Sequence, residues 1–173
     1  SDVEIKELEV TVALGLTDPP EGAFTDPRHP KLGWRLYSID AEKFNQPINW
    51  TKLRVDYVIP EYRSELTGES YILEMGFERL NGVDFKKGCY VGQEVTARMK
   101  HKTELHKGLV KIGSEQTMVN GEELFLNDKP IGSVLTVYDR SALAYVRLKN
   151  RDEILSTKST KRIFVDKNPI PSN

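Results

Sequence analysis

Residues 131–148, IGSVLTVYDRSALAYVRL, hold two apolar runs on either side of the turn residues Asp139-Arg140-Ser141. Other short apolar runs follow residue 105, with Asn120-Gly121 and Asn127-Asp128-Lys129 between them: LVKI at 109–112, ELFL at 123–126 and RIFV at 162–165. Short strands at this spacing, separated by turn residues, are typical of a small β-barrel or β-sandwich. We therefore predict a strand-rich domain over residues 105–167, followed by a tail at 168–173.

Strands are also predicted near the start of the chain. Apolar residues alternate there with other residues, as in a half-buried strand: Leu8, Val10, Val12 and Leu14. A second strand is predicted to start at Trp34, after a proline-containing irregular segment.

Two helices are predicted before residue 105. Residues 49–59 carry apolar side chains at helical spacing, and Asn49 is a suitable N-cap. Pro60 is expected to end this helix near Val58, because the residue before a proline disfavours helical backbone. A shorter helix is predicted over 95–101, and residues 61–88 are expected to be mostly irregular.

The composition indicates a globular protein of one mid-sized domain or two small ones. Of the 173 residues, 38% are hydrophobic and 29% are charged, and the net charge is −1 at pH 7. This balance argues against a general binder of nucleic acid or of membrane surfaces. No apolar run approaches the ~20 residues that a membrane-spanning helix needs. The one cysteine, Cys89, cannot form an internal disulfide, which favours a reducing compartment.

Cys89 lies in the segment DFKKGCYVGQEVTARMK, residues 84–100. Gly88 allows the backbone before it a sharp turn or a close approach to a ligand. Lys86 and Lys87 precede the thiol and a predicted helix begins just after it, and both surroundings favour the thiolate. A free cysteine is, however, most often a small buried side chain. The residues alone leave both interpretations open, a reactive thiol and a buried apolar side chain.

Metal binding by Cys89 is limited by a lack of partners in the sequence. An iron–sulfur cluster usually takes four thiolates, so this chain could supply at most one ligand to a shared cluster. A zinc site is disfavoured because His29, His101 and His106 lack ligand spacing. A Cys–His hydrolase would need a base within hydrogen-bond reach, and the spacing of these histidines does not support one. We therefore predict no metal site.

Polar residues near Cys89 and in two other segments are candidate ligand contacts. Gln93 and Glu94 either complement the dipole at a helix start or orient a heterocycle with its own donors and acceptors. Arg54 lies on the predicted helix 49–59 and could reach from the edge of the core to solvent. Glu74 interrupts the apolar stretch YILEMGF, so it either faces solvent or has a partner.

A basic run, RMKHKTELHK at 98–107, offers a further surface for an anionic ligand or nucleic acid. It lacks interleaved aromatic residues, which weakens its interpretation as a single-strand-binding surface. A solvated connector between two domains is an equally good explanation.

The stretch LNGVDFKKGCYVGQEVTARMKH, residues 80–101, resembles the signature of the YgfZ family, Lys-Gly-Cys-Tyr-x-Gly-Gln-Glu. The matching residues are Lys87, Gly88, Cys89, Tyr90, Gly92, Gln93 and Glu94. Residues 25–36, TDPRHPKLGWRL, are similar to a second family segment through Asp26, Pro27, Arg28, Leu32, Gly33, Trp34 and Arg35. Residues 73–83, LEMGFERLNGV, resemble a third, although Met75-Gly76-Phe77 stands where the family usually has a small residue, Asn and Leu.

The resemblance implies an α+β fold related to the glycine-cleavage T-protein, an aminomethyltransferase. Residues 1–104 would form the C-terminal part of a folate-binding body, and residues 105–167 a small antiparallel β-barrel. The chain begins at Ser1 without an initiator methionine, and we expect about another hundred residues before it, as in family members. That part would complete the folate-binding body and include the position of the T-protein's catalytic aspartate.

The resemblance also implies a function. Family members are linked to assembly or repair of iron–sulfur proteins, with tetrahydrofolate as the expected ligand, and bacterial members to tRNA thiolation. We accordingly predict a folate-dependent factor that acts on iron–sulfur proteins or their assembly factors, in the bacterial cytoplasm or, in a eukaryote, the mitochondrial matrix. The alternatives are a tetrahydrofolate-dependent aminomethyltransferase and a plain tRNA-binding module that uses residues 98–107.

The predicted site has two groups of residues, and whether it catalyses a reaction is left open. The signature supplies the reactive group: Cys89, with Lys87, Tyr90, Gln93 and Glu94 around it. Contacts to tetrahydrofolate are expected from Arg54, Glu74, Gly88, Gly92 and Arg98. An exposed Cys89 is expected to be alkylated faster than a model thiol at neutral pH.

Overall fold

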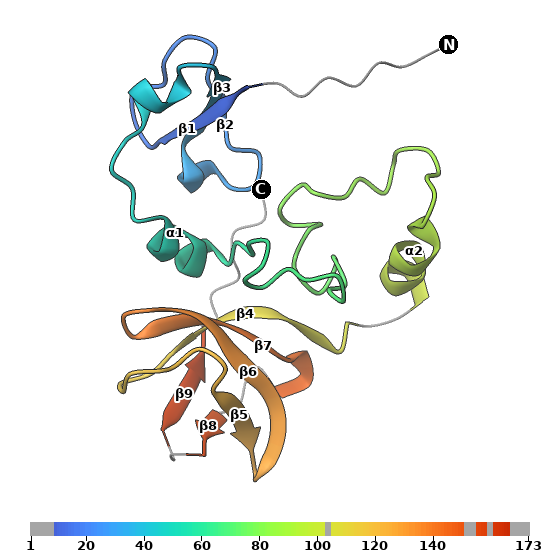
Figure 1. Ribbon diagram of the computed structural model, residues 1–173. Coiled ribbons are helices and arrows are strands. Elements are labelled where there is room, and N and C mark those ends of the chain that lie inside the picture. Colours follow the sequence, from blue (N-terminus) through green and yellow to red (C-terminus); the bar gives the residue numbers. More distant parts are fainter. Residues whose placement is uncertain (1–8, 103–104, 151–154, 159–160, 167–173) are drawn as a thin grey trace. The chain divides into compact units, whose positions relative to one another are not determined.

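The computed structural model describes residues 9–102, 105–150, 155–158 and 161–166. The chain divides into two compact units, Ser1–Asn49 and Trp50–Asn173. The boundary predicted near residue 105 falls inside the second unit, and the predicted tail at 168–173 lies outside the described residues. The elements labelled in Figure 1 are β1 (Thr11–Gly15), β2 (Phe24–Thr25), β3 (Trp34–Ser38), α1 (Trp50–Tyr57), α2 (Gln93–Lys102), β4 (Lys107–Gly113), β5 (Glu123–Leu126), β6 (Lys129–Tyr138), β7 (Ser141–Arg147), β8 (Leu155–Thr157) and β9 (Arg162–Val165).

The first unit is built on an antiparallel sheet with the strand order β1-β3-β2. One face of the sheet forms a small core with the short 3-10 helix η2 (Ala41–Phe44), through Ala13, Trp34, Leu36 and Ala41. The Trp34 ring lies directly over Gly15, where an added Cβ would come within 2.1 Å of it. Both predicted strands of this unit are confirmed, and β2 is an addition in a segment expected to be irregular.

The orientation of β1 differs from the alternation predicted for it. Val12 pairs with Tyr37 and Leu14 with Arg35, on the face opposite the core. Val10 and Val12 are 40% and 41% exposed, whereas Ala13 and Gly15 are buried. The reason is steric: the large Trp34 and Leu36 side chains of β3 point to the Ala13 face, and η2 covers them there. Leu8 lies outside the described residues.

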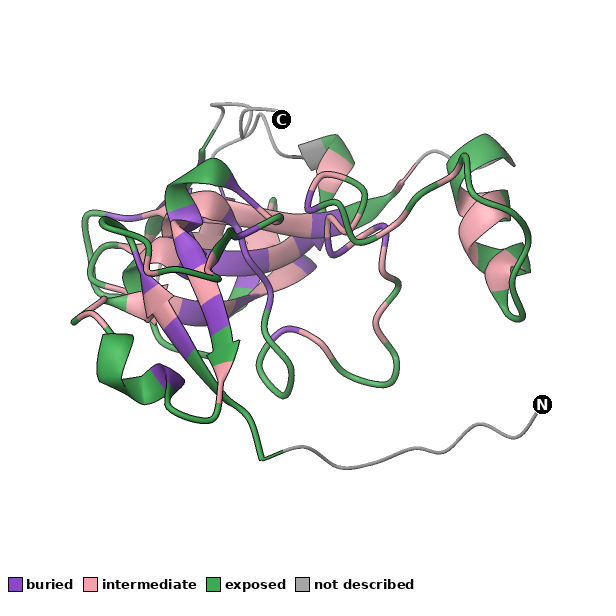
Figure 2. Ribbon diagram, turned by 90° about the horizontal axis from the view of Figure 1, so that it is seen from above, coloured by how far each residue is buried: buried purple, intermediate pink, exposed green. Residues whose placement is uncertain are grey.

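The second unit contains a closed antiparallel barrel with the strand order β4-β7-β6-β5-β8-β9. Buried residues recur along its strands (Figure 2), and most of them fill the interior. On β7, Ala142, Leu143 and Ala144 are buried in succession, because Leu143 packs on the outside of the barrel against Val55 and Val58. Every apolar run predicted after residue 105 is a strand, which confirms the predicted antiparallel β-barrel. The strand β8 was not predicted, because its three residues LST include one apolar side chain.

Helix α1 packs on the outside of this barrel. Val55 and Val58 contact Leu143 of β7, with Leu109 and Leu135 around them. The helix ends at Tyr57, as predicted from Pro60, and Val58 has a φ of 53°. The Arg79 guanidinium donates to the carbonyls of Tyr57 at 3.2 Å and of Val58 at 2.8 Å, which satisfies acceptors that a helix end leaves open.

Residues 58–92 join α1 to α2 without a helix or strand, as predicted; the segment consists of turns and an isolated bridge between Tyr62 and Leu66. Leu73, Met75 and Leu80 are nevertheless buried, so this segment adds to the core of the second unit. Over the described residues, the structure has no helix with the length and apolar character needed to cross a membrane.

Candidate functional site

Cys89 lies on an exposed loop that leads into α2, and its side chain is exposed. The residues from Lys86 to Gly92 are all exposed as well. Burial as a small apolar side chain, one of the two interpretations open from the sequence, is therefore wrong. A thiol in this position is accessible to a ligand or a partner, which a buried cysteine is not.

The loop closes onto the start of α2 through Gln93. Its side-chain Oε1 accepts a hydrogen bond from the Tyr90 backbone N–H at 3.1 Å, and its own N–H donates to the Tyr90 carbonyl at 3.3 Å. Gly92 has a φ of 87°, a backbone conformation that favours glycine. Gln93 and Gly92 thus fix the turn that carries Cys89 and Tyr90.

Charged side chains surround this turn. The Lys87 ammonium lies over the Tyr90 ring, 4.6 Å from its centroid. Glu94 and Arg98 form an ion pair at 2.6 Å, one turn apart on α2. Both partners are mostly exposed, so their pair contributes little stability and is available to a ligand.

Helix α2 contacts the segment before it through residues of its last turn. Lys100 forms an ion pair with Glu78 and lies over the Phe85 ring at 5.3 Å. The rings of Phe85 and His101 are arranged edge to face, with their centroids 6.2 Å apart. None of the α2 side chains described in the structure is buried. The first turn of α2, next to Cys89, therefore remains open.

An open pocket of about 420 Å³ lies along this helix, lined by Gln93, Glu94, Ala97, Arg98 and His101. Its size falls within the range of small-molecule sites, and its lining offers an amide, a carboxylate, a guanidinium and an imidazole. Three of the predicted site residues line it: Gln93 and Glu94 of the signature, and Arg98, which was expected to contact folate. These side chains can pair with a ligand that has a heterocycle with hydrogen-bond donors and acceptors, and a carboxylate that would pair with Arg98.

Arg54 occupies a different environment. Its guanidinium is buried and forms ion pairs with the buried Glu65 and, at 2.9 Å, with Glu61. Glu65 also accepts hydrogen bonds from Ser64 at 3.0 Å and from Thr136 of β6. Arg54 does not reach to solvent, as the sequence suggested it could, because its charge is neutralised in the interior.

Glu74 has the partner that an acid in an apolar stretch was expected to need. The Tyr145 hydroxyl of β7 donates to its carboxylate, and the Glu74 carbonyl accepts from the Leu109 N–H at 2.9 Å. Burial, together with the Glu74 carboxylate, raises the pKa of Tyr145 above its ordinary value. The hydrogen bonds and ion pairs among the described residues do not join Arg54 or Glu74 to the Cys89 loop, and contacts of either residue with folate stay a prediction.

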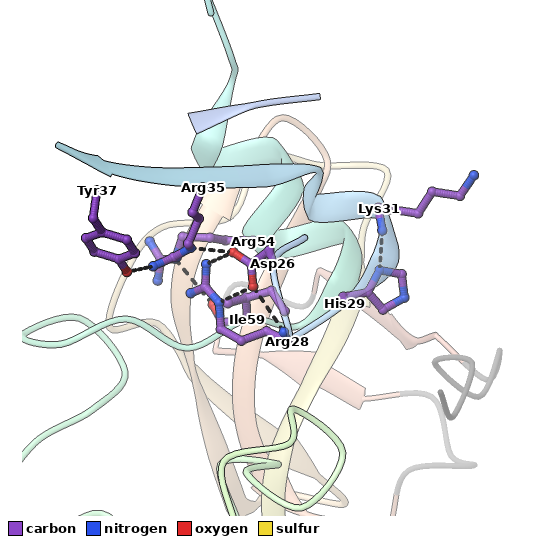
Figure 3. Close-up of polar contacts among 8 residues, drawn as sticks. All are labelled: Asp26, Arg28, His29, Lys31, Arg35, Tyr37, Arg54 and Ile59. Carbon is purple, nitrogen blue, oxygen red and sulfur yellow. Dashed lines mark hydrogen bonds and ion pairs between the residues drawn. The ribbon is translucent and has the colours of Figure 1, made fainter. Parts of the chain in front are cut away.

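A polar cluster in the first unit was not among the predicted site residues. The buried Asp26 accepts from Arg28 at 2.9 and 2.7 Å and from Arg35 at 2.6 Å (Figure 3). Burial would raise the pKa of Asp26, but the two guanidinium groups outweigh it and lower that pKa. The sequence did carry a signal for this cluster, since all three residues belong to the second stretch that resembles the YgfZ family.

No protein-family model matches the chain. Its curated relatives include the iron–sulfur cluster assembly factor IBA57, mitochondrial, of Mus musculus, 37% identical over 98 residues. The human protein of the same name is 36% identical over 95 residues, and the Neurospora crassa homolog is 36% identical over 98 residues.

These matches cover part of each chain. They take in 50–52% of this chain and 22–27% of each of the three relatives. The chain thus spans about a quarter of the length of the curated relatives that it matches. What the relatives do as whole proteins is therefore a starting point for a proposal on this chain.

Proposed function

We propose that this protein acts in the assembly or repair of iron–sulfur proteins, with Cys89 as the residue that makes contact with the cluster or its carrier. The observation that carries the proposal is the similarity to several proteins named as iron–sulfur cluster assembly factors. The exposure of Cys89 supports it, because a thiol must be accessible to bind a cluster that another protein holds. If the protein is eukaryotic, we further propose the mitochondrion as its location, as in those relatives.

The signature residues would act together at the open end of α2. Cys89 would present its sulfur, and Lys87 would hold the neighbouring Tyr90 ring through the contact of its ammonium group with that ring. Tyr90 and Gln93 would hold the turn in place through the hydrogen bonds between them. This arrangement leaves the sulfur free to approach a cluster as one ligand among several supplied by a partner.

We also propose tetrahydrofolate as a ligand, in the pocket along α2. Gln93 and Glu94 would pair with the donors and acceptors of the pterin ring, and Arg98 would pair with a glutamate carboxylate of the tail. Gly88 and Gly92 would leave space beside the ring, because neither has a neighbour within 4 Å of an added Cβ. Bound tetrahydrofolate would supply a one-carbon carrier beside the thiol.

A complementation experiment tests the function. Cells that lack their own protein of this kind receive the complete coding sequence that contains this chain, and the activity of an iron–sulfur enzyme is assayed in extracts. Recovered activity supports the proposal. No recovery from a soluble, expressed protein would contradict it.

A second assay separates the proposal from the aminomethyltransferase alternative. Transfer of a single carbon from an aminomethylated lipoyl carrier protein to tetrahydrofolate is measured with the purified protein. We expect no turnover above background, and turnover comparable to that of a T-protein would replace the assembly function. Binding of tRNA that weakens steeply with salt would instead favour the basic run, because phosphate contacts release counterions.

The folate ligand has its own test. Binding of tetrahydrofolate is measured by calorimetry with the wild type, Arg98→Gln and the matched control Arg162→Gln. Arg162 is exposed on β9, outside the pocket. We expect Arg98→Gln to weaken binding roughly 10-fold or more, the value of a charged hydrogen bond, and Arg162→Gln to leave it unchanged. Equal binding by all three proteins would contradict the proposal that folate binds in this pocket.

A further inference from the structure

The pocket along α2 is lined by one stripe of side chains on that helix. The five lining residues are Gln93, Glu94, Ala97, Arg98 and His101. Spacings of three and four residues place them on the same face of the helix. At a rise of about 1.5 Å per residue, the stripe from its first to its last residue is about 12 Å long. A ligand that fills the pocket therefore lies along the helix, and its parts meet different turns.

The chemistry of the stripe changes from its first turn to its last. Gln93 and Glu94 at the start offer an amide and a carboxylate. Ala97 in the middle has only a methyl group, which suits an apolar part of a ligand. Arg98 and His101 follow with a guanidinium and an imidazole, which are both N–H donors. The stripe thus complements a ligand with a polar heterocycle at one end, an apolar middle and an acidic tail.

Contacts outside the stripe hold His101 at its end. The His101 and Phe85 rings are arranged edge to face, with their centroids 6.2 Å apart. The Lys100 ammonium lies over the same Phe85 ring and pairs with Glu78. The imidazole is therefore positioned by a ring that is itself held by a charged side chain, and it stays exposed to a ligand.

Arg98 has donors to spare for the same ligand. Its Nη2 donates to Glu94 at 2.6 Å, and a guanidinium has five N–H donors in all. His101 follows Arg98 by three residues, so the two groups are about 4.5 Å apart along the helix axis. Two carboxylates joined by a few bonds can reach both groups at once.

We propose that His101 is a second tail-binding residue beside Arg98, and that the two residues select folates over pterins without a glutamate tail. The inference rests on the proposed folate site and adds to it a residue and a specificity. The tail of a folate carries two or more carboxylates, and Arg98 and His101 would each take one in a charge-assisted hydrogen bond. A pterin without the tail would lose both bonds.

A nucleotide fits the stripe less well than a folate. It also joins a polar heterocycle to an anionic group, but through a sugar whose hydroxyls need hydrogen-bond partners. The methyl group of Ala97 offers none at that place, whereas it suits the p-aminobenzoyl ring of a folate.

Calorimetry with three ligands tests the specificity. Binding to the wild-type protein is measured for tetrahydrofolate, for GTP and for tetrahydrobiopterin, which has a reduced pterin ring and no glutamate. We expect tetrahydrofolate to bind roughly 100-fold more tightly than tetrahydrobiopterin, about 10-fold for each charged hydrogen bond. Equal affinity for the two pterins would overturn the inference but leave a pterin site. Failure of tetrahydrofolate to bind, or tighter binding of GTP, would contradict the folate site itself.

Variants of His101 test its direct contact with the tail. His101→Ala is expected to weaken tetrahydrofolate binding roughly 10-fold and to leave tetrahydrobiopterin binding unchanged. His101→Lys, which supplies a cation at the same place, should recover the binding of tetrahydrofolate. His106→Ala is the matched control, because His106 is exposed and does not line the pocket. Wild-type affinity in His101→Ala, or equal weakening of both pterins, would contradict a contact between His101 and the tail.

Discussion

Cys89 and Arg54 lie at opposite extremes of exposure. The thiol stands on an open loop, whereas the guanidinium is enclosed by Glu65 and Glu61. Substitution of an exposed thiol changes the free energy of unfolding little, so it should affect function and leave stability intact. Substitution of a buried charged residue should instead lower stability, because it leaves the opposite charge buried without a partner.

We expect Cys89 to react with iodoacetamide in the folded protein at least as fast as in denaturant, because the fold does not shield it. The rate is followed by mass spectrometry at neutral pH, with Cys89→Ser as the unreactive control. Protection in the folded state, released by denaturant, would contradict the exposed position of the loop.

We expect Arg54→Met to lower the free energy of unfolding by about 3–5 kcal/mol, because it leaves the Glu65 carboxylate buried and unpaired. Unfolding in urea measures this change. Lys158→Met is the matched control: it breaks an exposed pair with Glu123, and should cost no more than about 1 kcal/mol. Equal costs for the two variants would contradict a structural role for the buried pair.

The sequence predicted the identity of these residues better than their surroundings. The Cys89 signature could be identified from contiguous residues. The burial of Arg54 could not, because its partner Glu65 is 11 positions away and Thr136, which completes the group, is on a distant strand. Long-range partners of this kind are invisible to local spacing.

At the scale of elements, the sheet of the first unit depends on one carboxylate. Asp26 follows β2 and binds Arg35 of β3, so it ties the two strands together. Such a tie should be sensitive to pH, since protonation removes the charge that both arginines need.

We expect the stability of this sheet to fall in acid. Burial opposes ionisation of Asp26, but its arginine partners lower its pKa below that of the unfolded chain. The unfolded state therefore takes up the proton first, and the stabilisation is complete above about pH 4 and is lost as the pH falls through the folded pKa. Asp26→Asn should be less stable at neutral pH and lose less stability in acid, by urea unfolding at both pH values. An unchanged acid dependence in Asp26→Asn would assign it to other carboxyl groups. One is Asp56, where burial would raise the pKa but Lys52 and Lys111 outweigh it and lower that pKa.

A glycine sets the contact between β6 and β7. An added Cβ at Gly132 would lie 2.2 Å from the Tyr145 carbonyl oxygen, which is part of the backbone and cannot move alone. Gly132→Ala should therefore lower the free energy of unfolding by about 1–3 kcal/mol or more. Gly68→Ala, where an added Cβ meets nothing within 4 Å, is the control and should be nearly neutral in the same urea titration. A neutral Gly132→Ala would contradict the close strand contact.

Helices and strands were predicted correctly where the sequence pattern is long. The prediction failed where the pattern is short, or where residues outside the element decide its pairing or orientation. The runs that form β4, β6 and β7 were clear from apolar residues and turn signals. The strand β8 has three residues, and its place depends on pairing with β5 and β9. The side-chain direction of β1 was decided by Trp34 and η2, which the alternation in β1 itself does not reveal.

At the scale of the whole molecule, the barrel and α1 belong to one unit with its own core. We expect residues 50–173 to fold without residues 1–49, because the apolar contacts of the barrel come from within this unit. Circular dichroism and a cooperative thermal transition of the shortened protein measure this. A shortened protein without a cooperative transition would show that the barrel needs the first unit.

The proposed function rests on Cys89, and complementation with two neighbouring variants tests it. Cells without their own protein of this kind receive Cys89→Ala or Val91→Ala in the complete coding sequence, at equal protein levels. Val91 is fully exposed on the same loop and stands at the variable position of the signature, so it controls for changes to the loop. We expect Val91→Ala to restore the activity of an iron–sulfur enzyme and Cys89→Ala to fail. Equal restoration by the two variants would contradict a role for the thiol.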